Sequence, residues 1–185
     1  MPEYDYTNHL LEVARLMELA CRTAPKSHGQ DFVEVKIVSG EEVRELAASM
    51  LSFGKKSGKE NFDRDAKNVE KSPVVVLIGL KNASTLGLNC SACGFASCDS
   101  LKQASRTNGE FAGPVCALRH LDFGIALGSA VKTAQILNVD NRIMYRIGVA
   151  ARESGFVDWD FVMGIPLSAT GKNIYYDREK RESKL

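Results

Sequence analysis

The stretch VVVLIGL, residues 74–80, follows directly on Pro73 and is the longest apolar run in the chain. A short run of continuous, mostly β-branched apolar residues predicts a strand buried on both faces, at the centre of a sheet that helices cover. Seven residues fall far short of the roughly 20 that a helix needs to cross a bilayer. The run therefore predicts a buried central strand and no membrane span.

The segments on either side of this run alternate between helical and strand patterns. Apolar residues recur at helical spacing from Asn8 to Cys21, with Thr7 or Asn8 as the cap, and FVEVKIV (32–38) alternates as a strand does. Ser39 and Glu42 resemble a capping box for a helix that runs to Leu51. Further elements follow the central run: helices at about 99–107, at 122–137 capped by Asp122 and at 141–154, and a strand near 160–165. This mixture predicts one α+β domain over residues 1–185, a sheet covered by helices.

Two stretches between these elements allow more than one interpretation. Residues 53–68 are polar and rich in lysine, and we interpret them as a solvated, mobile loop rather than a phosphate site, because a tight glycine frame is missing. Gly124 and Gly128 stand one helical turn apart, which permits close approach of another backbone. We expect that approach either within the core or between subunits.

Composition places the chain among proteins that bind neither nucleic acid nor membranes. The 24 basic and 23 acidic residues nearly cancel, which argues against an anionic partner surface. The N-terminus lacks the basic and apolar regions of a signal peptide. We expect a cytoplasmic protein whose five cysteines are reduced.

Four of these cysteines form the strongest functional pattern, Cys-x2-Cys-x4-Cys-x17-Cys, made by Cys90, Cys93, Cys98 and Cys116. Three thiolates within nine residues, separated by glycine and alanine, let one loop wrap a compact iron–sulfur core, and the fourth completes the set for a 4Fe-4S cluster. Residues 86–118 are therefore expected to form an inserted cysteine loop that handles single electrons.

Zinc and metal-free thiols are the alternatives for this set. Structural zinc sites usually present two Cys-x2–4-Cys knuckles, and Cys116 has no such neighbour, so the spacing favours iron–sulfur. Chance clustering of unliganded thiols is the third interpretation. Cys21 lies on the apolar face of the first helix and is interpreted as a core thiol.

The cysteine pattern, with Gly-Pro shortly before Cys116, resembles the small 4Fe-4S domain of electron-transfer complexes and corrinoid proteins. The wider chain is similar to an uncharacterised prokaryotic family that contains a ferredoxin domain, through RTAPKSHG, NCSACGFASC, DFGIALGSAV, VDNRIMYRIG and GIPLSATGKNIYYDR. That resemblance covers most of the chain and implies electron transfer.

The order of elements, with APKSHGQ after the first helix and GIP in the last strand, also resembles the nitroreductase family. This resemblance implies a homodimer that binds FMN across its interface. By the same resemblance, the FMN-binding residues come from two segments: Arg22, Thr23, Pro25, Lys26, Ser27 and Gly29 in the first, and Gly164, Ile165, Pro166, Lys172, Asn173 and Arg178 in the second. Guanidinium and ammonium groups suit the FMN phosphate.

The chain departs from the nitroreductase pattern at its start. EYDYTNHLL contains no Arg-Arg-Ser-x-Arg run, so phosphate binding falls to Arg22, Lys26 and the C-terminal basic residues. Alternatively, Arg22 and Lys26 complement the dipole at the helix C-terminus. His28 is expected to be exposed.

These observations predict an FMN-binding, nitroreductase-like oxidoreductase whose 4Fe-4S cluster exchanges electrons with the flavin. The alternatives are a ferredoxin-like module without flavin and a zinc-stabilised structural protein. No Ser/His/Asp or Cys/His set identifies a catalytic residue. The sequence also lacks a GxGxxG fingerprint, so we expect no Rossmann site. The expected electron partner is a nicotinamide or a donor or acceptor protein.

Overall fold

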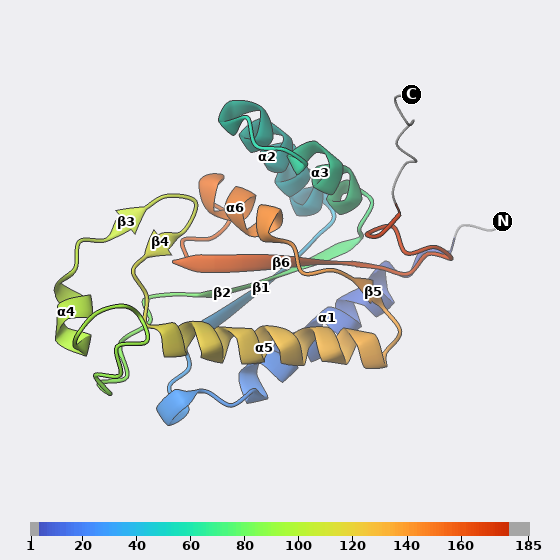
Figure 1. Ribbon diagram of the computed structural model, residues 1–185. Helices are drawn as coiled ribbons and strands as arrows, with labels where there is room; N and C mark the ends of the chain where they lie inside the picture. The colour runs from blue at the N-terminus through green and yellow to red at the C-terminus, as the bar shows by residue number, and fades with distance from the viewer. Residues whose placement is uncertain (1–3, 178–185) are drawn as a thin grey trace, which may run out of the picture.

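The computed structural model describes residues 4–177, and its centre is a four-stranded antiparallel sheet. The predicted central strand is confirmed as β2 (Val74–Leu80), in which all seven residues are buried. It lies between β1 (Val33–Ser39) and β6 (Phe161–Ser168), and the short β5 (Asp140–Asn141) pairs with the far side of β6. Figure 1 shows this sheet edge-on, with helices above and below it.

Helices cover both faces of the sheet, so the predicted α+β class is confirmed. One face carries α2 (Glu41–Ser57), α3 (Phe62–Glu70) and α6 (Tyr145–Glu153), and the other carries α1 (Thr7–Thr23) and α5 (Ala117–Ile136) (Figure 1). Side chains of β2 alternate between two cores: Val75 and Leu77 face the first helix layer, whereas Val76 and Ile78 face α1 and α5. This alternation explains why the whole run is apolar.

Contact between α6 and β6 is closest at two glycines. A Cβ atom on Gly148 would lie 1.9 Å from the carbonyl oxygen of Val162, and one on Gly164 would lie 2.0 Å from a side-chain methyl of Ile147. These positions require glycine because the helix rests directly on the strand backbone.

The prediction of a mobile loop over residues 53–68 is wrong. α2 continues to Ser57 and ends at Gly58, whose φ of 69° is the left-handed C-cap conformation. α3 begins at Phe62 and buries Phe62, Ala66 and Val69 at helical spacing. Charged residues fill the outer face of α3, which made the segment look like a loop, but its inner face completes the core.

Three predicted helix caps also differ from the structure. α5 begins at Ala117, so Asp122 lies inside the helix, where it is buried beside Arg119. The N-cap of α2 is Gly40 rather than Ser39, and the N-cap of α1 is Tyr6 rather than Thr7 or Asn8. Neither Gly40 nor Tyr6 makes a side-chain hydrogen bond to the helix that it caps. Glu42 instead pairs with Lys36, at 3.1 Å.

Segment 86–118 leaves the sheet after β2 and returns to it through α5. It contains α4 (Cys98–Gln103) and the hairpin of β3 (Thr107–Asn108) with β4 (Ala112–Gly113), and Figure 1 shows it at one end of the sheet. β5 lies toward the opposite end, as does the described C-terminal segment. None of the helices in the described chain has the length and hydropathy needed to span a membrane.

Candidate cofactor and cysteine sites

All four cysteines of the predicted metal set are free thiols on this one segment. Cys90 is exposed, Cys93 and Cys98 are half-buried, and Cys116 is only 6% exposed. The stretch that carries Cys90 and Cys93 turns sharply, because Gly87, Asn89, Ser91 and Gly94 all have positive φ. Glycine and asparagine adopt this conformation most readily, which explains the small residues between the thiols.

Backbone donors lie close to two of the cysteines. The Sγ of Cys98 accepts the N–H of Asn89 at 3.4 Å, and the N–H of Cys98 donates to the Oδ1 of Asn89 at 2.8 Å. Cys116 is the N-cap of the 20-residue α5, where the helix dipole favours negative charge. These surroundings suit thiolate ligands and the sulfides between them.

The four thiols do not converge on one point in this structure. Within residues 4–177, no three His, Cys, Asp or Glu side chains lie close enough together to hold a metal ion. The donor set therefore fits a four-thiolate cluster in number and chemistry, and binding one requires the segment to draw its thiols together.

Asp160 holds the base of the cysteine segment to the sheet. Its carboxylate accepts the N–H of Asn82 at 2.8 Å and pairs with Arg106 at 2.5 Å, so the stretch that leads into the loop and a residue in its second half meet at one side chain. Its backbone joins Leu80 to Ala112 through two further hydrogen bonds of 2.8 Å. The loop is therefore anchored at its base and exposed at Cys90.

Buried Arg119 links the two chain stretches that flank the cysteine segment to the first predicted flavin segment. Its guanidinium donates to the carbonyl oxygens of Ser84 and Ser27, each at 3.0 Å, and pairs with Asp122 at 3.1 Å. Asp122 in turn accepts the backbone N–H and the hydroxyl of Ser27, at 2.9 and 2.7 Å. The loop that carries η1 (Ser27–Gly29) is thus fixed against the first turns of α5.

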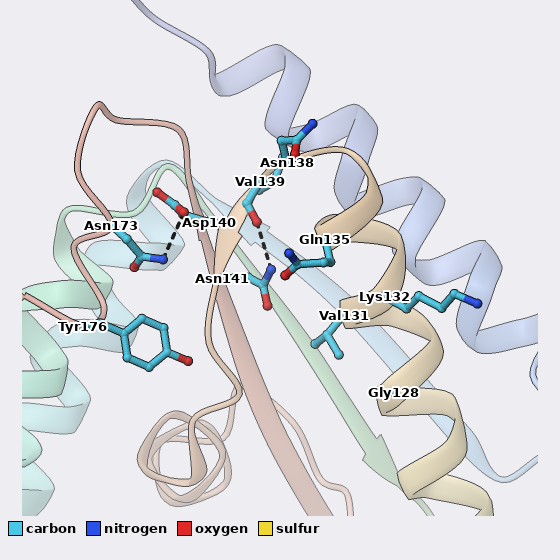
Figure 2. Close-up of a pocket in the computed structure, with 10 residues that line it drawn as sticks. All are labelled: Gly128, Val131, Lys132, Gln135, Asn138, Val139, Asp140, Asn141, Asn173 and Tyr176. Carbon is cyan, nitrogen blue, oxygen red and sulfur yellow. Dashed lines mark hydrogen bonds between the residues drawn. The ribbon is translucent and has the colours of Figure 1, made fainter.

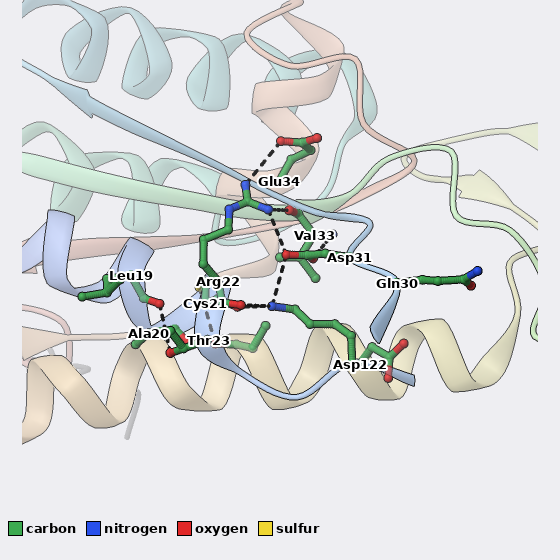
Figure 3. A network of polar contacts seen from close by, with 12 residues as sticks. Leu19, Ala20, Cys21, Arg22, Thr23, Gln30, Asp31, Val33, Glu34 and Asp122 are labelled. Atoms are coloured by element: carbon green, nitrogen blue, oxygen red, sulfur yellow. Dashed lines mark hydrogen bonds and ion pairs between the residues drawn. The ribbon is translucent and has the colours of Figure 1, made fainter. Parts of the chain in front are cut away.

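The two basic residues of that first segment are engaged within the chain (Figure 3). Arg22 pairs with Asp31 at 3.0 Å and donates to the carbonyl oxygen of Val33 at 2.7 Å, while Lys26, 4% exposed, lies 3.2 Å from the same carboxylate. Burial would raise the pKa of Asp31, but the N–H of Val33 and these two cations outweigh it and lower the pKa. Lys26 also donates to the carbonyl oxygens of Cys21 and Arg22, as the helix-dipole alternative predicts.

The remaining residues of the first segment are more open. Thr23 and Pro25 are exposed, with the Thr23 hydroxyl bonded to the carbonyl oxygen of Leu19 at 3.1 Å. Gly29 is also exposed and has a φ of 65°. His28 is exposed, as predicted. A ligand can therefore approach this loop closely, where it would contact mainly backbone groups.

The second predicted segment is divided between the core and the surface. Gly164, Ile165 and Pro166 are buried within β6, whereas Lys172 is exposed and pairs with Asp177 at 2.7 Å. Asn173 donates to Asp140 at 3.0 Å. Arg178 lies outside the described residues.

The two segments lie at opposite ends of the sheet. The β2–β6 ladder runs from the pair Leu80–Phe161, near the cysteine segment, to the pair Val74–Leu167, near Lys172. Six steps along an antiparallel strand span about 20 Å. Within one chain, the structure therefore does not bring Arg22 and Lys26 together with Lys172 and Asn173.

An open pocket of about 600 Å³ lies at the second end, between the last turns of α5, β5 and the segment after β6 (Figure 2). Its walls carry four amide side chains, one carboxylate, one lysine and one tyrosine: Gln135, Asn138, Asn141, Asn173, Asp140, Lys132 and Tyr176. Asp140 holds Asn173 in place, and the Asn141 side chain donates to the carbonyl oxygen of Val139 at 2.9 Å. Such a pocket offers hydrogen-bond donors and acceptors to a flat polar ring and a cation to an anionic group.

Sequence reasoning identified only Asn173 among these polar side chains. The others come mostly from KTAQILNVDN, residues 132–141, where polar residues follow a long apolar helix. That change in composition is a usable signal. These polar residues form a pocket only because the segment after β6 folds back beside α5.

Solved structures with the same fold include several nitroreductases. The chain is similar to nitroreductase CinD from Lactococcus lactis in complex with nicotinic acid, with a TM-score of 0.61 and 13% identity over 92% of this chain and 82% of that one. A putative nitroreductase in complex with FMN from Desulfovibrio desulfuricans gives a TM-score of 0.57 and 15% identity over 91% and 78%. The FMN-dependent nitroreductase NfnB from Mycobacterium smegmatis, in complex with NADPH, gives 0.56 and 12% over 92% and 84%. The predicted nitroreductase-like fold is confirmed.

Sequence relatives define the family more narrowly. A protein of Archaeoglobus fulgidus, described as an uncharacterized protein, is 49% identical over 181 residues, which cover 97% of this chain and 98% of that protein. Residues 112–178 match the family model "Uncharacterized protein containing a ferredoxin domain (DUF2148)", a range that includes Cys116 and the pocket residues named above. The chain therefore belongs to this ferredoxin-domain family and has the nitroreductase fold.

Proposed function

We propose that this protein is an FMN-binding oxidoreductase in which a 4Fe-4S cluster, held by Cys90, Cys93, Cys98 and Cys116, exchanges electrons with the flavin. The observation that carries the proposal is a polar, amide-lined pocket in a nitroreductase fold whose inserted segment holds four free thiols. A flavin exchanges one or two electrons, so it couples a one-electron cluster to a two-electron substrate.

The pocket at the end of α5 is the proposed flavin site. Amide side chains can both donate and accept, which suits the alternating carbonyl and N–H groups of the isoalloxazine pyrimidine edge. We assign that edge to Asn138, Asn141 and Asn173, and the phosphate to Lys132. Lys172, next to Asn173 in the chain, is assigned as a second cation that exchanges Asp177 for the phosphate. Tyr176 provides an aromatic surface beside them.

The first predicted segment has a different proposed role. Because Arg22 and Lys26 are paired with Asp31, their charges are already compensated. Ser27 is half-buried and bonded to Asp122 and Arg119, so Gly29 remains as the exposed backbone contact of this loop. Gly164, Ile165 and Pro166 support the strand that leads to the pocket. This division assigns phosphate binding to the second segment.

The proposal includes a homodimer and an external electron partner, either a nicotinamide or a protein. Nicotinamide-type ligands are present in two of the similar structures, nicotinic acid in CinD and NADPH in NfnB. Cys90 is the most exposed of the four thiols, so electrons from a protein partner are expected to enter at that end of the loop.

The test is the absorbance spectrum, with iron, zinc and flavin quantitation, of protein purified without oxygen. The proposal predicts a broad band near about 400 nm together with flavin bands. The paired variant Lys132→Ala/Asn173→Ala is expected to lower flavin content at least tenfold while iron stays unchanged. Lys67→Ala, an exposed lysine on α3, is the matched control. Protein that contains neither iron nor flavin would refute the proposal.

The main alternative is a ferredoxin-like module that carries a cluster and no flavin. The internal pairing of Arg22 and Lys26 favours it, because it removes two of the predicted phosphate ligands. Iron without flavin in the same measurement supports this alternative, and zinc without iron supports a zinc-stabilised structural protein.

A further inference from the structure

The segment that follows β6, residues 169–177, forms one wall of the pocket at the end of α5. Asn173 and Tyr176 line the pocket from this side, whereas the other lining residues belong to α5 and to residues 138–141 (Figure 2). This strap, as we call residues 169–177, contains turns but neither helix nor strand, and residues 169–172 are exposed. Contacts with the rest of the chain must therefore hold this wall in place.

Tyr175 is the one fully buried residue of the strap. Its side chain, 0% exposed, packs in the core that the sheet forms with α2, α3 and α6, whereas the next residue, Tyr176, is 62% exposed. Burying an aromatic side chain removes about 150–250 Å² of its surface from water. Two adjacent tyrosines thus have different roles, because one anchors the strap in the core and the other lies beside the pocket.

The hydroxyl of Tyr175 ties the strap to the turn between α3 and β2. It lies 2.8 Å from the Oγ of Ser72, which is itself buried. Ser72 donates its own proton to the carbonyl oxygen of Asn68 at 2.8 Å, so the O–H of Tyr175 donates to Ser72. Burial raises the pKa of Tyr175, and the hydroxyl therefore keeps the proton that this bond needs.

Two further contacts join the strap to β5 and to the residue after it. Asn173 donates to Asp140 at 3.0 Å and accepts the backbone N–H of Tyr175 at 3.1 Å. The carbonyl oxygen of Tyr175 accepts a hydrogen bond from Arg142 at 3.2 Å, and the same guanidinium lies 5.5 Å from the centre of the Tyr176 ring. Both strap residues that line the pocket are therefore connected to the backbone of Tyr175.

We propose that Tyr175 is a positioning residue for this pocket: its buried ring and its bond to Ser72 hold the strap, so that Asn173 and Tyr176 form the pocket wall only while Tyr175 is in place. Tyr175 does not itself line the pocket, so its effect on a ligand passes through the strap. A ligand that contacts this wall binds the held strap and, by linkage, stabilises it in return. The inference rests on the proposed function only in the choice of FMN as the probe.

Release of the strap is measured as the rate of trypsin cleavage after Lys172. The bond that follows Lys172 leads into Asn173 and has to leave the pocket wall to enter a protease, so its cleavage rate follows the released population. Tyr175→Phe, which loses only the hydroxyl, is expected to raise this rate about fivefold. Tyr175→Ala, which also loses the ring, should raise it at least about fiftyfold. Tyr4→Phe, at a tyrosine that is 69% exposed, is the matched control and should cleave as the wild type does.

A second control separates release of the strap from loss of the whole core. Met50→Ala weakens the same core from α2, where Met50 is fully buried. It should speed cleavage after Lys67, on α3, but leave cleavage after Lys172 within about twofold of the wild type, because the strap opens locally. Unchanged cleavage after Lys172 in both Tyr175 variants overturns the inference. An equal response to Met50→Ala and Tyr175→Ala also overturns it, since the strap would then open only with the core.

FMN tests the reciprocal effect. At 100 times its Kd, FMN should slow cleavage after Lys172 in the wild type about 100-fold. Tyr175→Ala should weaken FMN binding at least about tenfold, because the released strap has to be recovered before it can bind. Tyr175→Phe should keep the wild-type affinity, since its held form remains dominant. FMN that binds without protecting Lys172, or that binds Tyr175→Ala as tightly as the wild type, overturns the positioning role.

Gly128 supplies a variant on the opposite wall of the pocket (Figure 2). It lines the pocket, and a Cβ atom added there would meet nothing within 4 Å, as is also true of Gly124. Packing within the core, one of the two roles expected for these glycines, is therefore wrong. Gly128→Leu should block FMN binding but leave cleavage after Lys172 unchanged when no FMN is present. FMN binding by Gly128→Leu, or none by the wild type, refutes the proposed flavin site, and the cleavage rates of the Tyr175 variants then decide whether Tyr175 holds the strap.

Discussion

Replacing Arg119 with methionine should destabilise this protein more than most single substitutions. Arg119 is fully buried, and its guanidinium satisfies Asp122 as well as the carbonyl oxygens of Ser84 and Ser27. Methionine fills much of the same volume, so the cavity contribution stays small. Removing one partner of a buried ion pair costs about 3–5 kcal/mol, a large part of the roughly 5–15 kcal/mol that stabilises a domain.

Urea unfolding, followed by the fluorescence of Trp159 and by circular dichroism, measures this loss. Arg44→Met, on an exposed helix position, is the control and should stay within about 0.5 kcal/mol of the wild type. Adding Asp122→Asn removes the uncompensated charge but keeps an acceptor for Ser27. The double variant should therefore recover at least about 1 kcal/mol relative to additivity.

Two outcomes would contradict this reasoning. If Arg119→Met lowers the unfolding free energy by less than about 1 kcal/mol, water or a rearranged loop satisfies Asp122, and the ion pair does not hold the loops. Strict additivity in the double variant would show that the two residues act independently.

Three further predictions concern packing, the loop base and alkaline stability. Gly148→Ala should cost about 3 kcal/mol or more in urea unfolding, because its Cβ would meet the carbonyl oxygen of Val162, while Gly171→Ala, with open space around it, should change little. Asp160→Ala should leave the global unfolding midpoint within about 1–2 kcal/mol of wild type but accelerate hydrogen exchange throughout residues 82–113; unchanged exchange would rule out its anchoring role. Burial raises the pKa of Cys21 from 9.0 to about 11. The unfolded chain therefore loses this proton at a lower pH than the folded protein does. The free energy of unfolding should keep this contribution below about pH 9 and fall by roughly 2–3 kcal/mol toward pH 11. Cys21→Ala should flatten that decline, and an identical decline in the variant would assign it to other groups.

Strand and helix content followed from local patterns wherever one face or both faces of a segment are apolar. VVVLIGL predicted β2 because a strand between two helix layers has no polar face. The same reasoning failed for residues 53–68, since α3 buries only a narrow apolar stripe under a charged outer face. Asp122 was misplaced for a related reason: a carboxylate near a helix start resembles a cap, and only its burial beside Arg119 identifies it as an internal ion-pair partner.

The candidate sites were predicted to different degrees. Spacing alone identified the four cysteines of one segment, but it did not decide whether their thiols converge, and among the described residues no three of them do. The flavin residues were assigned as two segments that meet across a dimer interface, and within one chain the sheet separates those segments by its full length, so the assignment stays a prediction. The pocket side chains of α5 and β5 were missed, because they meet Asn173 only after the last strand crosses the sheet.

Local sequence patterns were enough to predict the buried strand, most of the helices and the set of four thiols, since each depends on the chemistry of neighbouring residues along the chain. Which distant groups meet was set by the way the elements pack together. That packing paired Arg22 and Lys26 with Asp31, placed Arg119 between two loops and formed the polar pocket at the far end of α5. Those contacts join residues up to about 90 positions apart, and such pairings depend on how strands and helices cross rather than on any local pattern.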